Sequence, residues 1–193
     1  GTYLRGTTFK GFQHLLNLAY SKHGYRVLGR GDWIQQEGLL SKGNFFFFFF
    51  ELEKQFSKFQ NLAVGSRYLV EHNALKSSDA DTLLKSAFSF DALTLYVKNS
   101  LSAPNSFNAE YTLRRDRAAK DNEFRQSTLG NTFALNANIT SIKNQEIKIT
   151  GAYRILKITD STLTALTPDE SLLGRLEYNF SALKGLLSGN LLY

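Results

Sequence analysis

Apolar and polar side chains alternate one for one along residues 132–140. Phe133, Leu135, Ala137 and Ile139 occupy one set of alternate positions, and Thr132, Ala134, Asn136, Asn138 and Thr140 occupy the other. Successive side chains of a β-strand point to opposite faces of its sheet, so this pattern predicts one face in an apolar medium and one in a polar medium. Similar alternation covers most of the chain, which predicts an all-β protein.

Two architectures fit such a sheet, and they differ in where the water lies. A soluble β-barrel or sandwich keeps its apolar face inside, whereas an outer-membrane β-barrel turns that face to lipid and lines a wet lumen with the other. We expect an antiparallel meander of about ten strands that forms an outer-membrane β-barrel or part of a larger one. A soluble β-barrel or sandwich is the alternative. Residues 1–193 are expected to be a single antiparallel β domain.

Clusters of Gly, Asn, Ser, Asp and Lys separate the candidate strands. The expected strands are 8–20, 25–36, 45–56, 62–72, 87–99, 106–115, 129–141, 146–159 and 176–193, the last of them bent or split at Gly185. Gly29 and Gly31 are expected to break the second strand. The remaining expectations are a turn at 41–44 and loops at 73–85, 116–126 and 160–174.

Six consecutive phenylalanines at 45–50 depart from the alternation. A strand there presents three rings to each face, and in water it would be prone to aggregate, because Lys42 and Glu51 are its nearest charged neighbours. Lipid or packed protein is therefore expected to cover it. The candidate apolar-contact residues are Trp33, Phe46, Phe48 and Phe50, which would line the cavity if the protein were soluble.

The polar positions of the expected strands carry charges of both signs. If the strands pair in register, the residues that share the polar face are Arg67, Glu71, Glu110, Arg114, Lys148, Thr150, Arg154, Glu177 and Asn179. Charges of both signs allow ion pairs and hydrogen bonds across the ladder. In a barrel this face would be the lumen, and its arginines and glutamates would set what passes or docks there. In a soluble sheet it would be the wet exterior.

Composition narrows the class of protein. The chain has a net charge of +6 and a mixed distribution of 23 basic and 17 acidic residues, which is weak evidence for nucleic-acid binding, and none is expected. It has no cysteine and no run of 18 apolar residues, so disulfides and membrane-spanning helices are excluded. It begins with Gly1 and contains no methionine, and we expect a fragment of a larger chain.

No motif indicates catalysis, a metal or a cofactor. His14, His23 and His72 lie in different segments, without a carboxylate or second histidine at ligand spacing. Glu51 and Glu53 share one strand face, where acidic pairs serve hydrolysis less often than they pair with Lys or Arg across the ladder. We therefore expect a non-enzymatic protein, without metal or cofactor.

The C-terminal third resembles a known group of proteins. The stretches that show the resemblance are 151–160, 166–180 and 185–193, with weaker likeness at 67–73, 81–84 and 89–91. They are similar to large, poorly characterised β-rich cell-envelope proteins of Bacteroidota. The resemblance is patchy and covers about half of the chain. It implies an envelope location and a piece of a larger protein, and it carries no catalytic residue.

These expectations combine into one functional hypothesis. The protein is a non-enzymatic component of a Gram-negative outer membrane or cell envelope, with a structural, transport or assembly role. Its expected partners are membrane lipid or other envelope proteins, including those of a larger complex. The alternative is a lipocalin-like soluble β-barrel or sandwich, periplasmic or secreted, that binds a lipid, a glycan or a partner protein.

Overall fold

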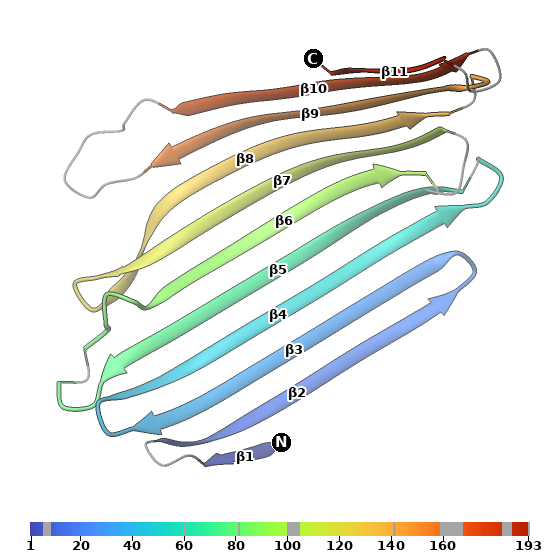
Figure 1. Cartoon of the computed structure of the whole chain (residues 1–193). Helices are drawn as coiled ribbons and strands as arrows, with labels where there is room; N and C mark the ends of the chain where they lie inside the picture. Colours follow the sequence, from blue (N-terminus) through green and yellow to red (C-terminus); the bar gives the residue numbers. More distant parts are fainter. Residues whose placement is uncertain are drawn as a thin grey trace.

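A computed structural model describes residues 1–5, 9–59, 61–80, 82–99, 105–140, 142–158, 168–182 and 187–192. These residues form eleven β-strands in one sheet, and each strand pairs with the next along the chain (Figure 1). Every ladder is antiparallel. The predicted all-β antiparallel meander is thus confirmed, with eleven described strands where about ten were expected.

The strands are long, and the nine central ones have 11 to 17 residues each. Their bounds are β1 Thr2–Arg5, β2 Phe9–Lys22, β3 Tyr25–Gly38, β4 Ser41–Phe56, β5 Leu62–Ser77, β6 Phe88–Lys98, β7 Asn105–Lys120, β8 Glu123–Ile139, β9 Gln145–Ile158, β10 Asp169–Ala182 and β11 Leu187–Leu192. Among the described strands no ladder joins β1 to β11, so the sheet is open.

Tight turns with left-handed backbone join two of the hairpins. His23 and Gly24 connect β2 to β3 with φ angles of 53° and 76°, and Asp121 and Asn122 connect β7 to β8 with φ angles of 51° and 64°. Positive φ at both positions is the mark of a type I′ turn, whose twist matches that of the flanking strands. The two turns therefore favour long, continuous hairpins.

The structure corrects four boundaries. Residues 41–44 are the first residues of β4 rather than a turn, and the connection between β3 and β4 consists of Leu39 and Leu40. β5 runs on to Ser77, and residues 116–126 form most of a hairpin tip rather than a loop. β10 starts at Asp169, inside the last expected loop. The first part of that loop, 160–167, and the expected bend at Gly185 lie outside the described residues.

Gly29 and Gly31 do not break β3. The register places Phe50 opposite Gly29 and Phe48 opposite Gly31, and neither glycine has positive φ. A Cβ atom built on Gly29 would lie 3.4 Å from the Cβ of Leu18, which is ordinary contact. Large neighbours on the adjoining strands fill the space that the glycines leave, so the ladder continues through them.

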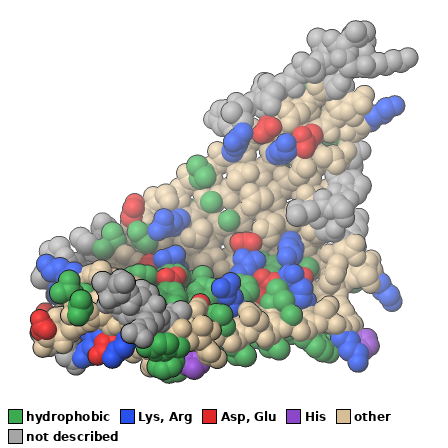
Figure 2. All heavy atoms as spheres, turned by 60° about the horizontal axis from the view of Figure 1, so that its bottom comes forward, with side chains coloured by type: hydrophobic (Ala, Val, Ile, Leu, Met, Phe, Trp, Pro, Cys, Tyr) green, Lys and Arg blue, Asp and Glu red, His purple; other side chains and the backbone are tan. Residues whose placement is uncertain are grey.

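The sheet is bent, and its two faces differ in burial. Figure 2 shows one part of the sheet rising from the other, with basic and acidic side chains gathered on the inside of the bend. Glu51 and Glu53 are 6% and 8% exposed, whereas Phe12 and Phe133 on the other face are about half exposed. The described part of the sheet thus buries charge on its inner side and presents large apolar groups on its outer side.

Candidate functional site

The strand register assigns the side chains of β2 to β10 to two faces, because directly opposite residues of an antiparallel ladder share a face. The residues in line with Glu51 are Leu28, Arg67, Thr94, Thr112, Thr132 and Arg154. The residues in line with Phe48 include Leu16, Gly31 and Val70. We call the face of Glu51 the polar face and the face of Phe48 the apolar face.

The candidate polar residues lie on one face. The register places Arg67, Glu71, Glu110, Arg114, Lys148, Thr150, Arg154, Glu177 and Asn179 on the polar face, distributed over β5, β7, β9 and β10. They do not meet at one point. Arg67 joins a cluster on β3 to β6, whereas Lys148 belongs to a separate group on β9 and β10. Their functional role stays a prediction.

The densest group of charges, the Glu51–Glu53 cluster, comprises Arg26, Glu51, Glu53, Arg67, Tyr96 and Lys98 on four consecutive strands. Arg26 binds both carboxylates, and the Nε of Arg67 lies 3.0 Å from an oxygen of Glu51. The Nζ of Lys98 lies 2.8 Å from Glu53. Three cations thus hold two nearly buried carboxylates, which offsets the cost of removing those charges from water.

Tyr96 reaches across a strand to complete this cluster. Its hydroxyl donates to Glu53, two strands away, over 2.9 Å. Gly65 lies between them in the register, and a Cβ atom built there would be only 2.5 Å from the Tyr96 ring and hydroxyl. The Tyr96 ring also carries the Arg67 guanidinium 5.1 Å and the Lys98 ammonium 4.8 Å from its centroid. The absence of a side chain at Gly65 therefore makes room for the ring.

Two smaller charge groups follow along the polar face. Arg114 pairs with Asp116 at 2.8 Å and lies 4.2 Å from the ring centroid of Phe90, while Thr128 donates to Asp116. The second group has Lys148 between Glu146 and Glu177, with Arg175 on the other side of Glu177. Charges of both signs therefore line this face across the described sheet, and they neutralise one another locally.

The candidate apolar residues share the other face. Trp33 pairs directly with Phe46 in the register, and the rings of Phe46 and Phe48 stack with centroids 6.4 Å apart. Phe50 follows on the same side of β4. Phe45, Phe47 and Phe49 point to the polar face, where they are partly buried. The phenylalanine run therefore presents three rings to each face, and Trp33 and Phe46 are exposed.

The apolar face contains a band without charges. On this face the described parts of β2 to β10 carry no Lys, Arg, Asp or Glu within 12–20, 25–35, 44–52, 62–74, 93–97, 105–113, 129–139, 145–155 and 172–180 respectively. On this face a charge bounds the stretch at both ends on β2 and β4 and at one end on the other strands except β8, as at Lys10, Lys42, Asp91 and Lys157. Within the same residue ranges, the opposite, polar face carries the charges of Glu51, Arg67 and Arg154.

Sequence reasoning missed three of the six members of the Glu51–Glu53 cluster, namely Arg26, Tyr96 and Lys98. It paired Glu51 and Glu53 with unspecified basic residues, and those residues are Arg26, Arg67 and Lys98. Arg26 and Lys98 lie on the two outer strands of the cluster. The register sets Arg26 directly opposite Glu53, and it sets Lys98 in line with Gln55, two residues from Glu53. A signal was available in Tyr96 and Gly65, because glycine opposite an aromatic residue favours close packing across a ladder.

The described residues offer no site for a metal. Among them, no three His, Cys, Asp or Glu side chains are grouped so that they could hold an ion. In the part of the chain that the structure describes, no helix is long and apolar enough to cross a membrane. Comparison with protein-family models, with curated proteins and with solved structures finds no match.

Proposed function

We propose that the chain forms part of the wall of a bacterial outer-membrane β-barrel, with its apolar face against lipid and its polar face toward the lumen. The observation that carries this proposal is the uncharged band on the exposed apolar face. Soluble monomers rarely expose contiguous apolar patches larger than a few hundred Å². The band crosses nine strands and includes Leu16, Leu95 and Phe133, each at least half exposed. Lipid is the medium that stabilises such a surface.

The band has the height that a bilayer requires. It spans 9 residues on β2, β4, β7 and β10, 11 on β3, β8 and β9, 13 on β5 and 5 on β6, the shortest of these strands. Transmembrane β-strands need about 9 to 11 residues to cross the hydrocarbon core when they are tilted. On β2 and β4 the strand continues past the band at both ends, to Lys10 and Lys22 and to Lys42 and Lys54, whereas on the other strands the uncharged stretch reaches or nearly reaches one end of the strand.

The band also runs at a slant across the sheet. Following the ladders from Glu170 on β10 leads to Leu18 on β2, eight residues beyond the boundary charge Lys10. Eight residues span ~27 Å along a strand, and the eight steps between these strands span ~38 Å. The boundary lies in one row from β2 to β5 and shifts by six residues between β5 and β6, so ~35° is its average slope over the eight steps, which is close to the strand tilt of about 35–45° in transmembrane barrels.

The end of the band near Lys10 shows an ordered change of side chains. Successive rows across β2 to β5 carry first the charges of Lys10, Glu37, Lys42 and Lys76, then Phe12, Gln35, Asn44 and Ala74, and then His14, Trp33, Phe46 and His72. Charge thus gives way to amides and then to rings. Barrels in membranes place aromatic girdles at the same depth, between headgroups and acyl chains.

The open edges of the sheet are consistent with a larger barrel. Because all described ladders are antiparallel, β1 and β11 run in the same direction. Bacterial single-chain barrels have an even number of antiparallel strands. The proposed barrel therefore needs further strands between β1 and β11. Its role is structural, transport or assembly, without catalysis, and the charges of Arg67, Arg114 and Arg154 would act on whatever enters the lumen.

The chain's only tryptophan provides a direct test. The protein is reconstituted into phosphatidylcholine vesicles whose acyl chains carry bromine, which quenches tryptophan, either near the headgroup or near the methyl end. Trp33 lies two rows inside the charged row, so bromine near the headgroup is expected to quench it more strongly. Folded protein should also run with heat-modifiable mobility on a gel.

A matched variant moves the probe to the middle of the band. In Trp33→Phe with Phe133→Trp, bromine near the methyl end should become the stronger quencher, because Phe133 lies near the centre of the β8 stretch. A protein that is monodisperse without detergent and is quenched by neither lipid would overturn the proposal. If that soluble protein carries a bound hydrophobic ligand, the lipocalin-like alternative takes its place.

A further inference from the structure

Glu71 of β5 lies among phenylalanines on the polar face. The register sets it directly between Phe47 of β4 and Phe90 of β6. The four diagonal positions on those strands hold three more rings and one small side chain, namely Phe45, Phe49, Phe88 and Ala92. Glu71 is partly buried, and among the described residues no basic side chain lies within ion-pair distance of it. A carboxylate beside hydrocarbon rings is destabilised unless a cation or a hydrogen-bond donor reaches it.

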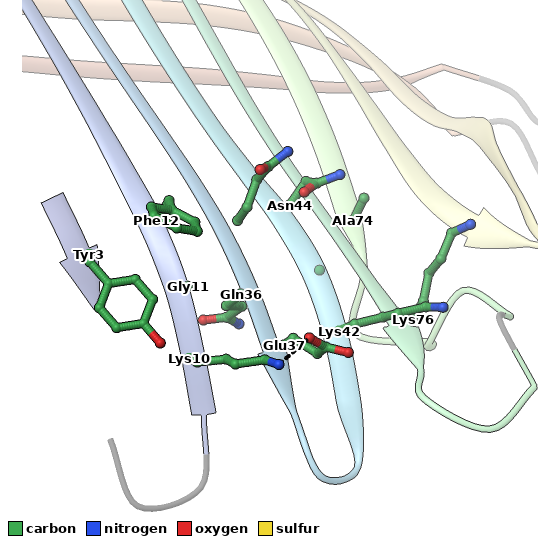
Figure 3. Close-up of a pocket in the computed structure, with 12 residues that line it drawn as sticks. Tyr3, Lys10, Gly11, Phe12, Gln36, Glu37, Lys42, Asn44, Ala74 and Lys76 are labelled. Atoms are coloured by element: carbon green, nitrogen blue, oxygen red, sulfur yellow. Dashed lines mark ion pairs between the residues drawn. The ribbon is translucent and has the colours of Figure 1, made fainter. Parts of the chain in front are cut away.

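Three other glutamates of the sheet each bind a cation. Figure 3 shows the ion pair between Lys10 and Glu37, whose atoms are 3.2 Å apart, in a groove of about 730 Å³ at the charged end of the apolar face. Glu51 and Glu53 each bind basic residues of the cluster described above. Glu71 therefore differs from these acids in two respects, the missing cation and the rings that surround it.

The charges near Glu71 are negative on balance. From β3 to β7, its row contains three acids and the next row contains two arginines, so the two rows sum to −1; these residues are Asp32, Glu71, Asp116, Arg30 and Arg114. Arg114 is paired with Asp116 at 2.8 Å, and Asp32 is bonded to a neutral amide. An added cation is therefore attracted to the position of Glu71.

The two rings beside Glu71 are spaced to hold a cation between them. Neighbouring strands lie about 4.8 Å apart, so a cation above Glu71 would lie ~5 Å from Phe47 on one side and from Phe90 on the other. Aromatic faces attract a cation within about 6 Å of the ring centroid. Both rings already interact with a cation from an outer strand, since Arg30 lies 5.8 Å from the centroid of Phe47 and Arg114 lies 4.2 Å from that of Phe90.

We propose that Glu71, Phe47 and Phe90 bind a small organic ammonium ion. Aromatic rings recognise alkylated ammonium groups, and the carboxylate supplies the opposite charge. Calcium would need about six to eight oxygen ligands, far more than one carboxylate offers. The polar face meets water in a barrel lumen and on a soluble sheet alike, so this inference does not depend on the membrane proposal. In the proposed barrel it names the class of solute that the lumen holds.

The test measures the binding of tetramethylammonium to the folded protein. Protein in a deuterated non-ionic detergent is added to tetramethylammonium chloride, whose single proton resonance broadens when the ion binds to a large particle. Glu71→Gln is expected to weaken binding roughly tenfold, because it removes the opposite charge. Phe47→Leu should weaken it roughly threefold, the usual contribution of one ring. Glu37→Gln and Phe46→Leu make the same two changes on the apolar face and should leave binding unchanged.

Several outcomes would overturn this inference. No broadening with the wild-type protein, or equal affinity of the wild-type protein and Glu71→Gln, would refute the site. Sodium ions that displace tetramethylammonium at equal concentration would show a place for any counter-ion and refute the choice of an organic ammonium. Heat-modifiable mobility of each variant reports the fold. Trp33 quenching tests the membrane location separately, so a soluble protein that binds tetramethylammonium would refute the proposed function and support the ammonium site.

Discussion

At the scale of single residues, Gly65 has the greatest local consequence. Its missing side chain lets Tyr96 lie over β5 and donate to Glu53, which is nearly buried and also binds Arg26 and Lys98. A methyl group at this position meets the ring at 2.5 Å and the backbone oxygen of Leu52 at 2.8 Å. The ring therefore has to move away, and the bond to the carboxylate is lost.

We expect Gly65→Ala to lower the free energy of unfolding by about 2 kcal/mol, the usual worth of a hydrogen bond to a buried charge. Gly130→Ala is the matched control on the same face, since its nearest neighbour would lie at 3.6 Å. It should change stability by less than about 0.5 kcal/mol. Urea titration in detergent micelles, followed by Trp33 fluorescence, measures both. Equal stability of the two variants would contradict the packing described for Tyr96.

At the scale of elements, the turn between β7 and β8 is hydrogen-bonded to the segment that precedes β6. Asn122 has a φ of 64°, and its side-chain oxygen accepts the backbone N–H of Leu83 over 2.7 Å. Asn122→Ala removes the bond and strains the backbone, so it should cost about 1–2 kcal/mol of unfolding free energy. Asn122→Gly relieves the strain and loses the bond alone.

Hydrogen exchange separates the two contributions of Asn122. The Leu83 amide should exchange faster in both variants, because each lacks the acceptor. The unfolding midpoint should fall clearly for alanine and only slightly for glycine, because glycine adopts positive φ at no steric cost. An unchanged exchange rate at Leu83 in either variant would contradict the coupling between this turn and the segment that precedes β6.

The elements show which parts of the fold the sequence reveals. The strand identities were predictable because period-two alternation is a local signal, as in β8. The hairpin tip formed by β7 and β8 was not, because Arg114 and Asp116 point to one face while Arg115 and Arg117 point to the other. With charge on both faces, the alternation disappears. The continuity of β3 was hidden for another reason, because Leu16 and Leu18 on β2 and Phe50 on β4 pack beside its glycines.

The sequence predicted which candidate residues share one face of the sheet, but not which of them are in contact. Alternation places Arg67, Arg114 and Arg154 on one side without any knowledge of partners. Which side chains form ion pairs across the strands depends on the strand register. The register depends on the positions of the turns, which the sequence did not determine. The turn at Leu39 and Leu40, for example, consists of apolar residues and gives no turn signal. Sequence reasoning therefore could not bring Arg26 to Glu53, which are 27 positions apart.

At the scale of the whole molecule, the slant of the uncharged band gives the membrane proposal a sharp prediction. Leu135 on β8 is in line with Lys22 on β2 and Lys54 on β4, yet it lies inside the band. Leu135→Lys should destabilise the protein in bilayers by about 2 kcal/mol or more. Asn136→Lys, the next residue on the polar face, should have little effect. Urea unfolding from phosphatidylcholine vesicles measures both.

The soluble alternative differs in the medium in which the loss is seen. It keeps the apolar face inside, so Leu135→Lys would place a charge in a protein core and destabilise the protein in buffer without vesicles. A loss for Leu135→Lys no larger than that for Asn136→Lys would contradict an apolar medium at this face. A larger loss for protein that folds only in vesicles or detergent would support lipid as that medium.

The odd number of described strands also limits how two copies of this chain could combine. Copies inserted into a membrane in the same orientation bring strands of equal direction to any shared seam, whether β1 meets β1, β11 meets β11 or β1 meets β11. Each of these seams would be parallel, unlike every ladder in the described sheet. In the proposed barrel, the complementary arc therefore comes from an odd number of strands of different sequence, and twofold self-assembly does not supply it.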